Sequence, residues 1–312
     1  MSNKLNEKFY HAIFISPHLD DAVFSCGAEI QKIAQKGKVL VINIFTLFLE
    51  EDKRSKVFLG EERYIEEKNA ANYLNFESIN LDFLDAFYRN DKYKKLANIF
   101  KQSSSSEAKL IHEVSEKLTS LLSQIDFDVI YLPLGVGWHI DHLVCHELRL
   151  NKLFADKIIF YEDMPYAQIL PSLDLRFSQL VPMKANKHFI FMNSFLLARS
   201  FLACGMTSTI KPNILKCIIF PFIFIFFLKL LMIHKKNNSF DKKMTYVPKV
   251  SQNSEFFNRK VQAIKMYNSQ LKVLFGSEEK VEETYQTYSK LILNNNKAVE
   301  RFWSIDAEIT KG

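Results

Sequence analysis

Hydrophobic and polar positions alternate in blocks from residue 9 to about residue 190. Short, nearly continuous apolar runs predict strands at 9–16, 38–46, 78–83, 127–132 and 157–161. Apolar residues at helical spacing predict helices at 22–36, 61–74 and 140–154, and another after the serine run 103–106. Strands that alternate with helices predict an α/β domain whose mostly parallel sheet is covered by helices on both faces.

This alternation stops after about residue 190. We expect residues 9–190 to form the main domain, residues 191–254 to be an apolar and basic insertion, and residues 255–312 to return to the main domain. The returning part has a helical pattern at 255–274 and ends with another polar helical stretch.

The insertion contains an apolar run, Cys217–Ile233, within the segment 214–236. An interfacial or re-entrant membrane anchor, a buried core helix and a membrane span all fit it. The run falls short of the roughly 20 residues that a spanning helix needs. A span would also place the parts before and after it on opposite sides of a membrane, which disfavours that interpretation.

Basic residues flank the apolar run. Residues 211–249 contain one acidic residue, Asp241, and eight lysines, namely Lys211, Lys216, Lys229, Lys235, Lys236, Lys242, Lys243 and Lys249. Basic residues beside an apolar run favour contact with anionic lipid headgroups over nucleic-acid binding. We therefore expect peripheral membrane contact through 214–236 and no nucleic-acid partner.

The composition is ordinary for a globular protein, with 312 residues, 48% hydrophobic and 24% charged residues and a net charge of +6. The four cysteines, Cys26, Cys145, Cys204 and Cys217, are far apart, so neither a zinc knuckle nor a disulfide framework is expected. Residues 1–8 lack the apolar core of a signal peptide. These features favour a cytoplasmic location, with membrane contact at the inner face.

Two short polar clusters follow predicted strands. Residues 16–21 carry His18, Asp20 and Asp21, and residues 137–142 carry two further histidines. Since open α/β sheets hold ligands at the carboxyl ends of their strands, we expect the clusters to meet there.

The clusters offer the ligand types of a catalytic metal. A zinc site of this kind uses three imidazole or carboxylate ligands and an open position, and His18, Asp21 and His142 supply such a set. Asp20, next to a ligand, can accept a proton from metal-activated water. Such a site also accepts iron or manganese.

Two other residues of the second cluster fit the same chemistry. His139 precedes His142 by three positions and could stabilise an oxyanion or protonate a leaving amine. Asp141 could hold His139 in the required tautomer.

The pattern Ser16-Pro17-His18-Leu19-Asp20-Asp21-Ala22, together with Gly137-x-His139-x-Asp141-His142, resembles the LmbE-like, or PIG-L, family of Rossmann-like deacetylases. The resemblance implies a zinc enzyme that removes an acetyl group from N-acetylglucosamine-type sugars. It implies metal ligation by His18, Asp21 and His142, a base at Asp20, and an electrostatic or acid role for His139.

Other segments resemble the family less specifically. The resemblance implies that Arg63 and Asp85 contact substrate, and that 161–166 closes the pocket. Segments 260–270 and 300–303 resemble its C-terminal elements.

We expect a metal-dependent hydrolase that acts on an N-acetylated amino sugar, as a glycan or glycolipid precursor. Two alternatives stay open. One is a metal-dependent amidase for a non-sugar amide, such as a peptide, antibiotic or thiol conjugate. The other is a membrane-associated binding protein that uses the same fold without catalysis.

Overall fold

The computed structural model describes residues 9–48, 60–101, 104–148, 150, 152–180, 187–207, 210–211, 213–237, 245–252, 254–293 and 297–305. Lys242 and Lys243 of the basic cluster, and the N-terminal residues 1–8, lie outside these ranges.

In this part of the chain one mixed sheet forms the centre of the molecule, with strand order β3-β2-β1-β4-β5-β7-β6. The pairs from β3 to β5 are parallel, whereas β7 pairs antiparallel with β5 and with β6. The strands are β1 (Phe9–Ser16), β2 (Val39–Leu47), β3 (Glu77–Leu84), β4 (Asp126–Pro133), β5 (Ile158–Tyr161), β6 (Tyr246–Gln252) and β7 (Val299–Ile305).

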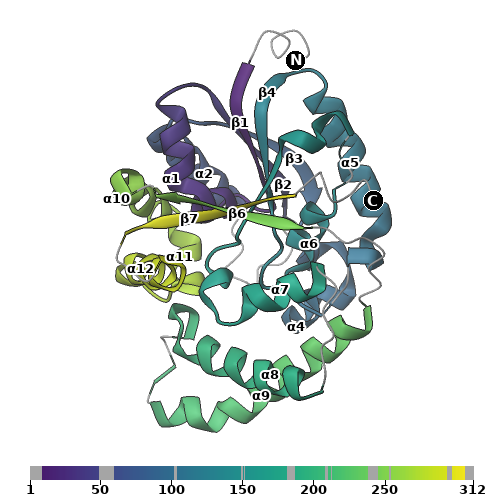
Figure 1. Cartoon of the computed structure of the whole chain (residues 1–312), viewed down its shortest axis with the longest axis vertical. Helices are drawn as coiled ribbons and strands as arrows, with labels where there is room; N and C mark the ends of the chain where they lie inside the picture. Colours follow the sequence, from purple (N-terminus) through teal and green to yellow (C-terminus); the bar gives the residue numbers. More distant parts are fainter. Residues whose placement is uncertain are drawn as a thin grey trace.

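Helices cover both faces of the sheet (Figure 1). They are α1 (Asp21–Ala34), α2 (Gly60–Leu74), α3 (Ala86–Arg89), α4 (Leu96–Ile99), α5 (Ala108–Leu122), α6 (Ile140–His146), α7 (Ser172–Leu180), α8 (Lys187–Ala203), α9 (Asn213–Asn237), α10 (Ser254–Ile264), α11 (Asn268–Leu274) and α12 (Glu279–Leu293). Helix α1 packs against α2 and α10, and α5 packs against α6. The mostly parallel α/β fold expected from the alternating pattern is confirmed.

The apolar strands β1, β2 and β4 lie in the core as expected, since β1 and β2 are almost completely buried, as are residues 130–133 of β4. Three local expectations are wrong. The helix expected over 140–154 ends at His146, and the helix expected over 255–274 is interrupted between α10 and α11. Strands β6 and β7 were not expected, and they extend the sheet with antiparallel pairs.

A buried ion pair joins the C-terminal elements to the first helix. Lys260 of α10 and Glu300 of β7 are both buried, with Nζ and Oε1 2.7 Å apart. Glu300 also accepts hydrogen bonds from the backbone N–H groups of Ala28 and Glu29 in α1. These additional donors compensate for the cost of removing the carboxylate from water. The segment after the insertion is therefore packed into the same fold as β1–β5.

Helices α8 and α9 form a hairpin that lies as a separate layer across the lower end of the molecule (Figure 1). A second apolar cluster joins the hairpin to the rest, with Leu197 and Leu230 packed near Trp138 and Leu143. By length and composition, Asn213–His234 of α9 is apolar enough to cross a membrane.

Candidate metal centre

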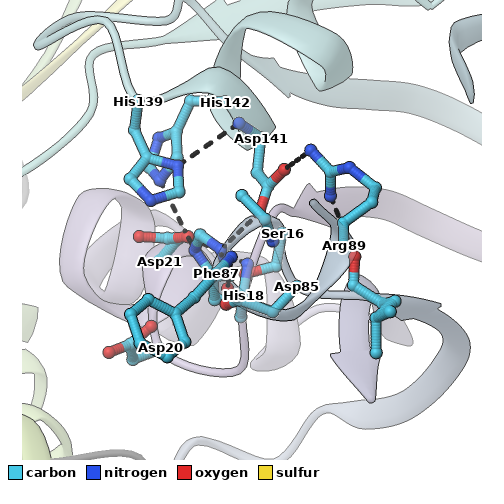
Figure 2. A network of polar contacts seen from close by, with 12 residues as sticks. Ser16, His18, Asp20, Asp21, Asp85, Phe87, Arg89, His139, Asp141 and His142 are labelled. Carbon is cyan, nitrogen blue, oxygen red and sulfur yellow. Dashed lines mark hydrogen bonds and ion pairs between the residues drawn. The ribbon is translucent and has the colours of Figure 1, made fainter. Parts of the chain in front are cut away.

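The two polar clusters meet at the carboxyl ends of β1 and β4, which are neighbours in the sheet. The first cluster leads into α1 and the second into α6, and these helices leave toward different faces of the sheet (Figure 1). This is the switch point at which open α/β sheets place their ligand crevice. Figure 2 shows the side chains of both clusters pointing toward one another.

His18, Asp21 and His142 bring one ligand atom each to a common point. His18 Nδ1 lies 2.9 Å, and His142 Nε2 3.2 Å, from Asp21 Oδ2. All three residues are buried, and their ligand atoms lie within 4.8 Å of one another. Ligands of a tetrahedral zinc ion lie about 3.3 Å apart, given bonds of about 2.0–2.1 Å. The donor set and its spacing therefore fit a divalent metal ion.

Carboxylates contact the other nitrogen of both candidate histidine ligands. His142 Nδ1 lies 2.6 Å from Asp163 Oδ1, and His18 Nε2 lies 3.2 Å from Asp141 Oδ2. Carboxylates in this position fix the ring orientation and the tautomer of metal-binding histidines. Asp163 had no assigned role in the sequence, although the segment 161–166 pointed to its neighbourhood.

The Asp141 side chain makes different contacts from those expected. Its carboxylate accepts hydrogen bonds from Arg89 Nη2 at 2.7 Å and from the Ala86 backbone N–H at 3.0 Å. The expected partner, His139, instead accepts a hydrogen bond from the backbone N–H of Asp141, at 3.3 Å to Nδ1. The tautomer of His139 is thus set by the Asp141 backbone, while the Asp141 carboxylate faces His18 and Arg89 (Figure 2).

This hydrogen bond leaves the proton of neutral His139 on Nε2. Burial, with the nearby His18, lowers the pKa of His139 well below its usual value. At neutral pH the ring is therefore uncharged and can donate one hydrogen bond through Nε2.

Asp20 lies beside the ligand set, and Arg63 contacts it. Arg63 Nη2 lies 3.2 Å from Asp20 Oδ1, and both side chains are buried. Burial raises the pKa of Asp20 above its usual value, against the opposing charge of Arg63. A higher pKa makes the carboxylate a stronger proton acceptor. Asp85 is also close, with Oδ2 3.4 Å from His18 Nε2, and its other oxygen accepts from the Phe87 N–H at the start of α3.

Without a metal, protons stabilise this cluster. Burial disfavours a charged His18, but hydrogen bonds to Asp141 and Asp21 raise its pKa well above the usual value. His142 shows the same balance: despite burial, Asp21 and Asp163 raise its pKa to about 10. A cation at the ligand atoms would replace these protons, because metal ions bind the deprotonated imidazole.

The turn before α6 depends on Gly137. Its φ is +90°, and a Cβ there would lie 2.7 Å from Tyr166 Cγ. Trp138 follows with φ +63°, and its indole donates to Gln179. This left-handed turn directs His139 and His142 toward the first cluster, and glycine adopts such a φ without steric cost.

His18, Asp21 and His142 line a cavity of about 530 Å³. The polar residues expected at the site, including Arg63 and Asp85, line this cavity, except Asp141, which is completely buried. Much of the remaining lining is apolar and comes from the hairpin, for example Ile223, Phe226 and Phe227 of α9.

Fold and site together define a Rossmann-like α/β protein with a buried His/Asp centre that fits a divalent metal. Residues 13–152 match the PIG-L family, described as GlcNAc-PI de-N-acetylase. The resemblance to this family, inferred from the two polar clusters, is confirmed for that part of the chain.

A curated relative is 2'-N-acetylparomamine deacetylase of Streptomyces fradiae, 26% identical over 174 residues. The match covers 52% of this chain and 60% of the relative, so it spans less than two thirds of that protein.

Solved structures share the fold along most of the chain. The A40926 pseudoaglycone deacetylase Dbv21 superposes with a TM-score of 0.59 at 20% identity, covering 95% of this chain and 97% of that one. A deacetylase from the biosynthesis pathway of teicoplanin reaches 0.63 at 19% identity, covering 96% and 100%. At these identities the likeness establishes the fold.

Proposed function

We propose that this protein is a zinc-dependent hydrolase that removes an N-acetyl group from an N-acetylated amino sugar. One observation carries the proposal: three buried residues that line a cavity bring their ligand atoms together, beside a carboxylate with a raised pKa and a neutral histidine. The PIG-L match and the deacetylase relative support the same chemistry.

In this proposal His18 Nδ1, Asp21 Oδ2 and His142 Nε2 hold the zinc ion. When bound, the ion lowers the pKa of water and polarises the acyl oxygen. Asp20 accepts the proton of the attacking water. Arg63, 3.2 Å away, keeps the Asp20 carboxylate in place and limits the rise of its pKa.

His139 stabilises the negative charge that develops on the acyl oxygen, by donating its Nε2 proton. Because its Nδ1 already accepts from the Asp141 backbone, the ring is oriented before substrate binds. Because its pKa is lowered, His139 is uncharged at neutral pH, which disfavours it as the general acid that protonates the leaving amine. The proton taken up by Asp20 is therefore the one that passes to the leaving amine. Attack, collapse and this transfer yield acetate and a free amino sugar.

The cavity also suggests the kind of sugar. Arg63 and Asp85 offer hydrogen-bonding groups for sugar hydroxyls, next to the centre. The apolar wall from α9 suits an apolar aglycone, as in a glycolipid precursor. The names of the similar proteins describe deacetylases of 2'-N-acetylparomamine and of the A40926 pseudoaglycone.

The experiment is acetate release from a panel of N-acetylated sugars, soluble and with alkyl aglycones, by zinc-loaded protein. Release that disappears in the Asp20→Asn variant would support the proposal. If no sugar reacts while a non-sugar amide is cleaved by the same zinc-loaded protein, the sugar assignment is wrong. A cytoplasmic location stays a prediction.

A further inference from the structure

The outer face of the α8–α9 hairpin is an apolar surface. Several large apolar side chains of the two helices are at least 40% exposed, among them Phe191, Phe195, Ile214, Ile218, Phe222 and Ile225. Phe222, at 71%, and Ile214, at 67%, are the most exposed of them. Contiguous apolar surface of this kind marks an interaction site.

Ring contacts join the two helices within this surface. Phe191 of α8 lies 5.1 Å, centroid to centroid, from Phe224 of α9, and Phe195 lies 5.3 Å from Phe220. The exposed side chains of α8 therefore continue into those of α9 across the seam between them.

Helix α9 is apolar on two opposite sides. Ile214, Ile218, Phe222 and Ile225 recur at intervals of four and three residues, so they follow one side of the helix. The opposite side, with Phe227 and others, faces the cavity of the metal centre. A helix that is apolar all round is normally buried on all sides or in contact with lipid.

Charge favours an anionic partner. Between Asp174 and Asp241 the sequence contains no acidic residue, but it contains nine lysines and arginines. Arg199 of α8 and Lys229 of α9 are exposed on the hairpin. Each basic residue near an anionic lipid surface adds to the attraction between the protein and that surface.

The path of the chain indicates a peripheral contact. The end of α9 is packed against the catalytic domain: Leu230 and Leu231 are buried, and His234 Nε2 lies 3.1 Å from the Phe100 carbonyl oxygen. The chain then returns through β6 to the central sheet, which also contains β1–β5. A single span by α9 would place parts of one sheet on both sides of the bilayer.

We propose that the outer face of the α8–α9 hairpin docks on the surface of an anionic lipid bilayer. The apolar side chains enter the interface while Arg199 and Lys229 contact headgroups. Since the inner side of α9 lines the cavity, docking places the cavity wall against the membrane. This goes beyond the proposed hydrolysis, because the docking surface shares no residue with the metal centre.

The test is co-sedimentation of the full chain with vesicles, either of phosphatidylcholine alone or of phosphatidylcholine mixed with phosphatidylglycerol. We expect the wild-type protein to bind the mixed vesicles at least about tenfold more strongly, and to be released by salt. The double variant Ile218→Asp/Phe222→Asp should lose at least about tenfold in binding, because carboxylates then face the interface.

The matched control is Ile65→Asp on α2. It is the same substitution at a similarly exposed helical position, 61% against 59% for Ile218, and it should bind vesicles like the wild type. A second variant, Arg199→Glu/Lys229→Glu, should lose the preference for phosphatidylglycerol. Circular dichroism spectra that match the wild type confirm that each variant is folded.

Three results would overturn the proposal. In the first, the wild type binds neither kind of vesicle. In the second, the Ile218→Asp/Phe222→Asp variant binds vesicles as well as the wild type. In the third, sedimentation without lipid shows a wild-type dimer that the Ile218→Asp/Phe222→Asp variant does not form. The last result would assign the face to a second copy of the chain. None of these readouts depends on turnover, so the proposed hydrolysis can fail or succeed separately.

Discussion

At the residue scale, each candidate histidine ligand uses one ring nitrogen toward Asp21 and the other toward a carboxylate. Asp163 contacts His142 at 2.6 Å, and Asp141 contacts His18 at 3.2 Å. Asp141 is itself neutralised by Arg89. The rings are thus held in position from behind, so little rearrangement is needed when a cation binds.

Asp163→Asn should therefore weaken metal binding without removing a ligand. We expect a loss of about 10–100-fold in zinc affinity, because the amide is a poorer acceptor for the Nδ1 proton of His142. Competition with a chromogenic chelator measures the affinity. Asp128→Asn, at an exposed position of β4, is the control and should bind zinc like the wild type. Unchanged affinity in Asp163→Asn would contradict the orienting role.

Asp20→Asn separates proton transfer from metal binding. The substitution keeps the size of the side chain and removes its basicity, so zinc content should be unchanged while kcat falls about 10²–10⁴-fold. Zinc analysis of the purified variant and acetate release measure the two quantities. Turnover equal to that of the wild type would rule out Asp20 as the base.

At the scale of elements, a buried carboxylate joins α2 to both the sheet and α11. Glu67 accepts hydrogen bonds from Asn43 of β2, from Ser78 of β3 and from the Tyr267 hydroxyl at the start of α11. Tyr267 leaves helical geometry there, with φ −89° and ψ 59°, which explains why the helix expected over 255–274 is interrupted. Burial, against these hydrogen bonds, raises the pKa of Glu67 from 4.5 to about 7.

This shift predicts how stability depends on pH. The folded state keeps the Glu67 proton at pH values where the unfolded state loses it, so this contribution is present below pH 4.5 and is lost as pH rises through 7. The loss amounts to about 3 kcal/mol. Glu67→Gln should reduce the fall in unfolding free energy between pH 5 and 8 by about this amount.

Denaturant unfolding at several pH values measures this difference. The control is Glu61→Gln, at an exposed position of the same helix, and it should follow the wild-type pH dependence. The same slope in Glu67→Gln as in the wild type would show that Glu67 does not titrate in this range.

The helices and strands that could be predicted from the sequence are those in which apolar residues form a continuous run or recur at regular spacing. Strands β1 and β2 and the second half of β4 are buried, and they read as apolar runs. Strand β6 was missed because it is an edge strand with mostly exposed residues, among them Pro248 and Lys249, and so has no alternating pattern.

In the candidate site, too, the residues that could be predicted are those with a local sequence pattern. His18, Asp21 and His142 occur in two compact clusters at strand ends, which is why the sequence pointed to them. Asp163 and Arg89 act through partners that are distant along the chain, so no local pattern identified them. The roles assigned to Arg63 and Asp85 stay predictions, although both residues line the cavity.

At the scale of the whole molecule, the metal centre links segments that are far apart in the chain. His18 lies in the turn between β1 and α1, Asp21 begins α1, and His142 comes from α6, which follows β4. A metal held by all three would bind the folded state much more strongly than the unfolded chain, and would stabilise it by mass action.

Zinc should therefore raise Tm. At a free concentration of about 100 times Kd the gain is about 2.7 kcal/mol, which corresponds to a rise of a few degrees. A chelator should reverse the rise, and His142→Ala should abolish it. Differential scanning calorimetry with and without zinc measures the shift. A full shift in His142→Ala would exclude His142 from the ligand set.

Strand β7 has a further consequence, for synthesis of the protein. It pairs with β5 although about 140 residues separate them in sequence, and its Arg301 and Trp303 hold Glu162, the neighbour of Asp163. While the ribosome is still translating the hairpin and α10–α12, the nascent chain has β5 as an unpaired sheet edge, which is prone to aggregation. The hydrogen bonds from Arg301 and Trp303 to Glu162, the residue next to Asp163, thus form only when β7 has been translated.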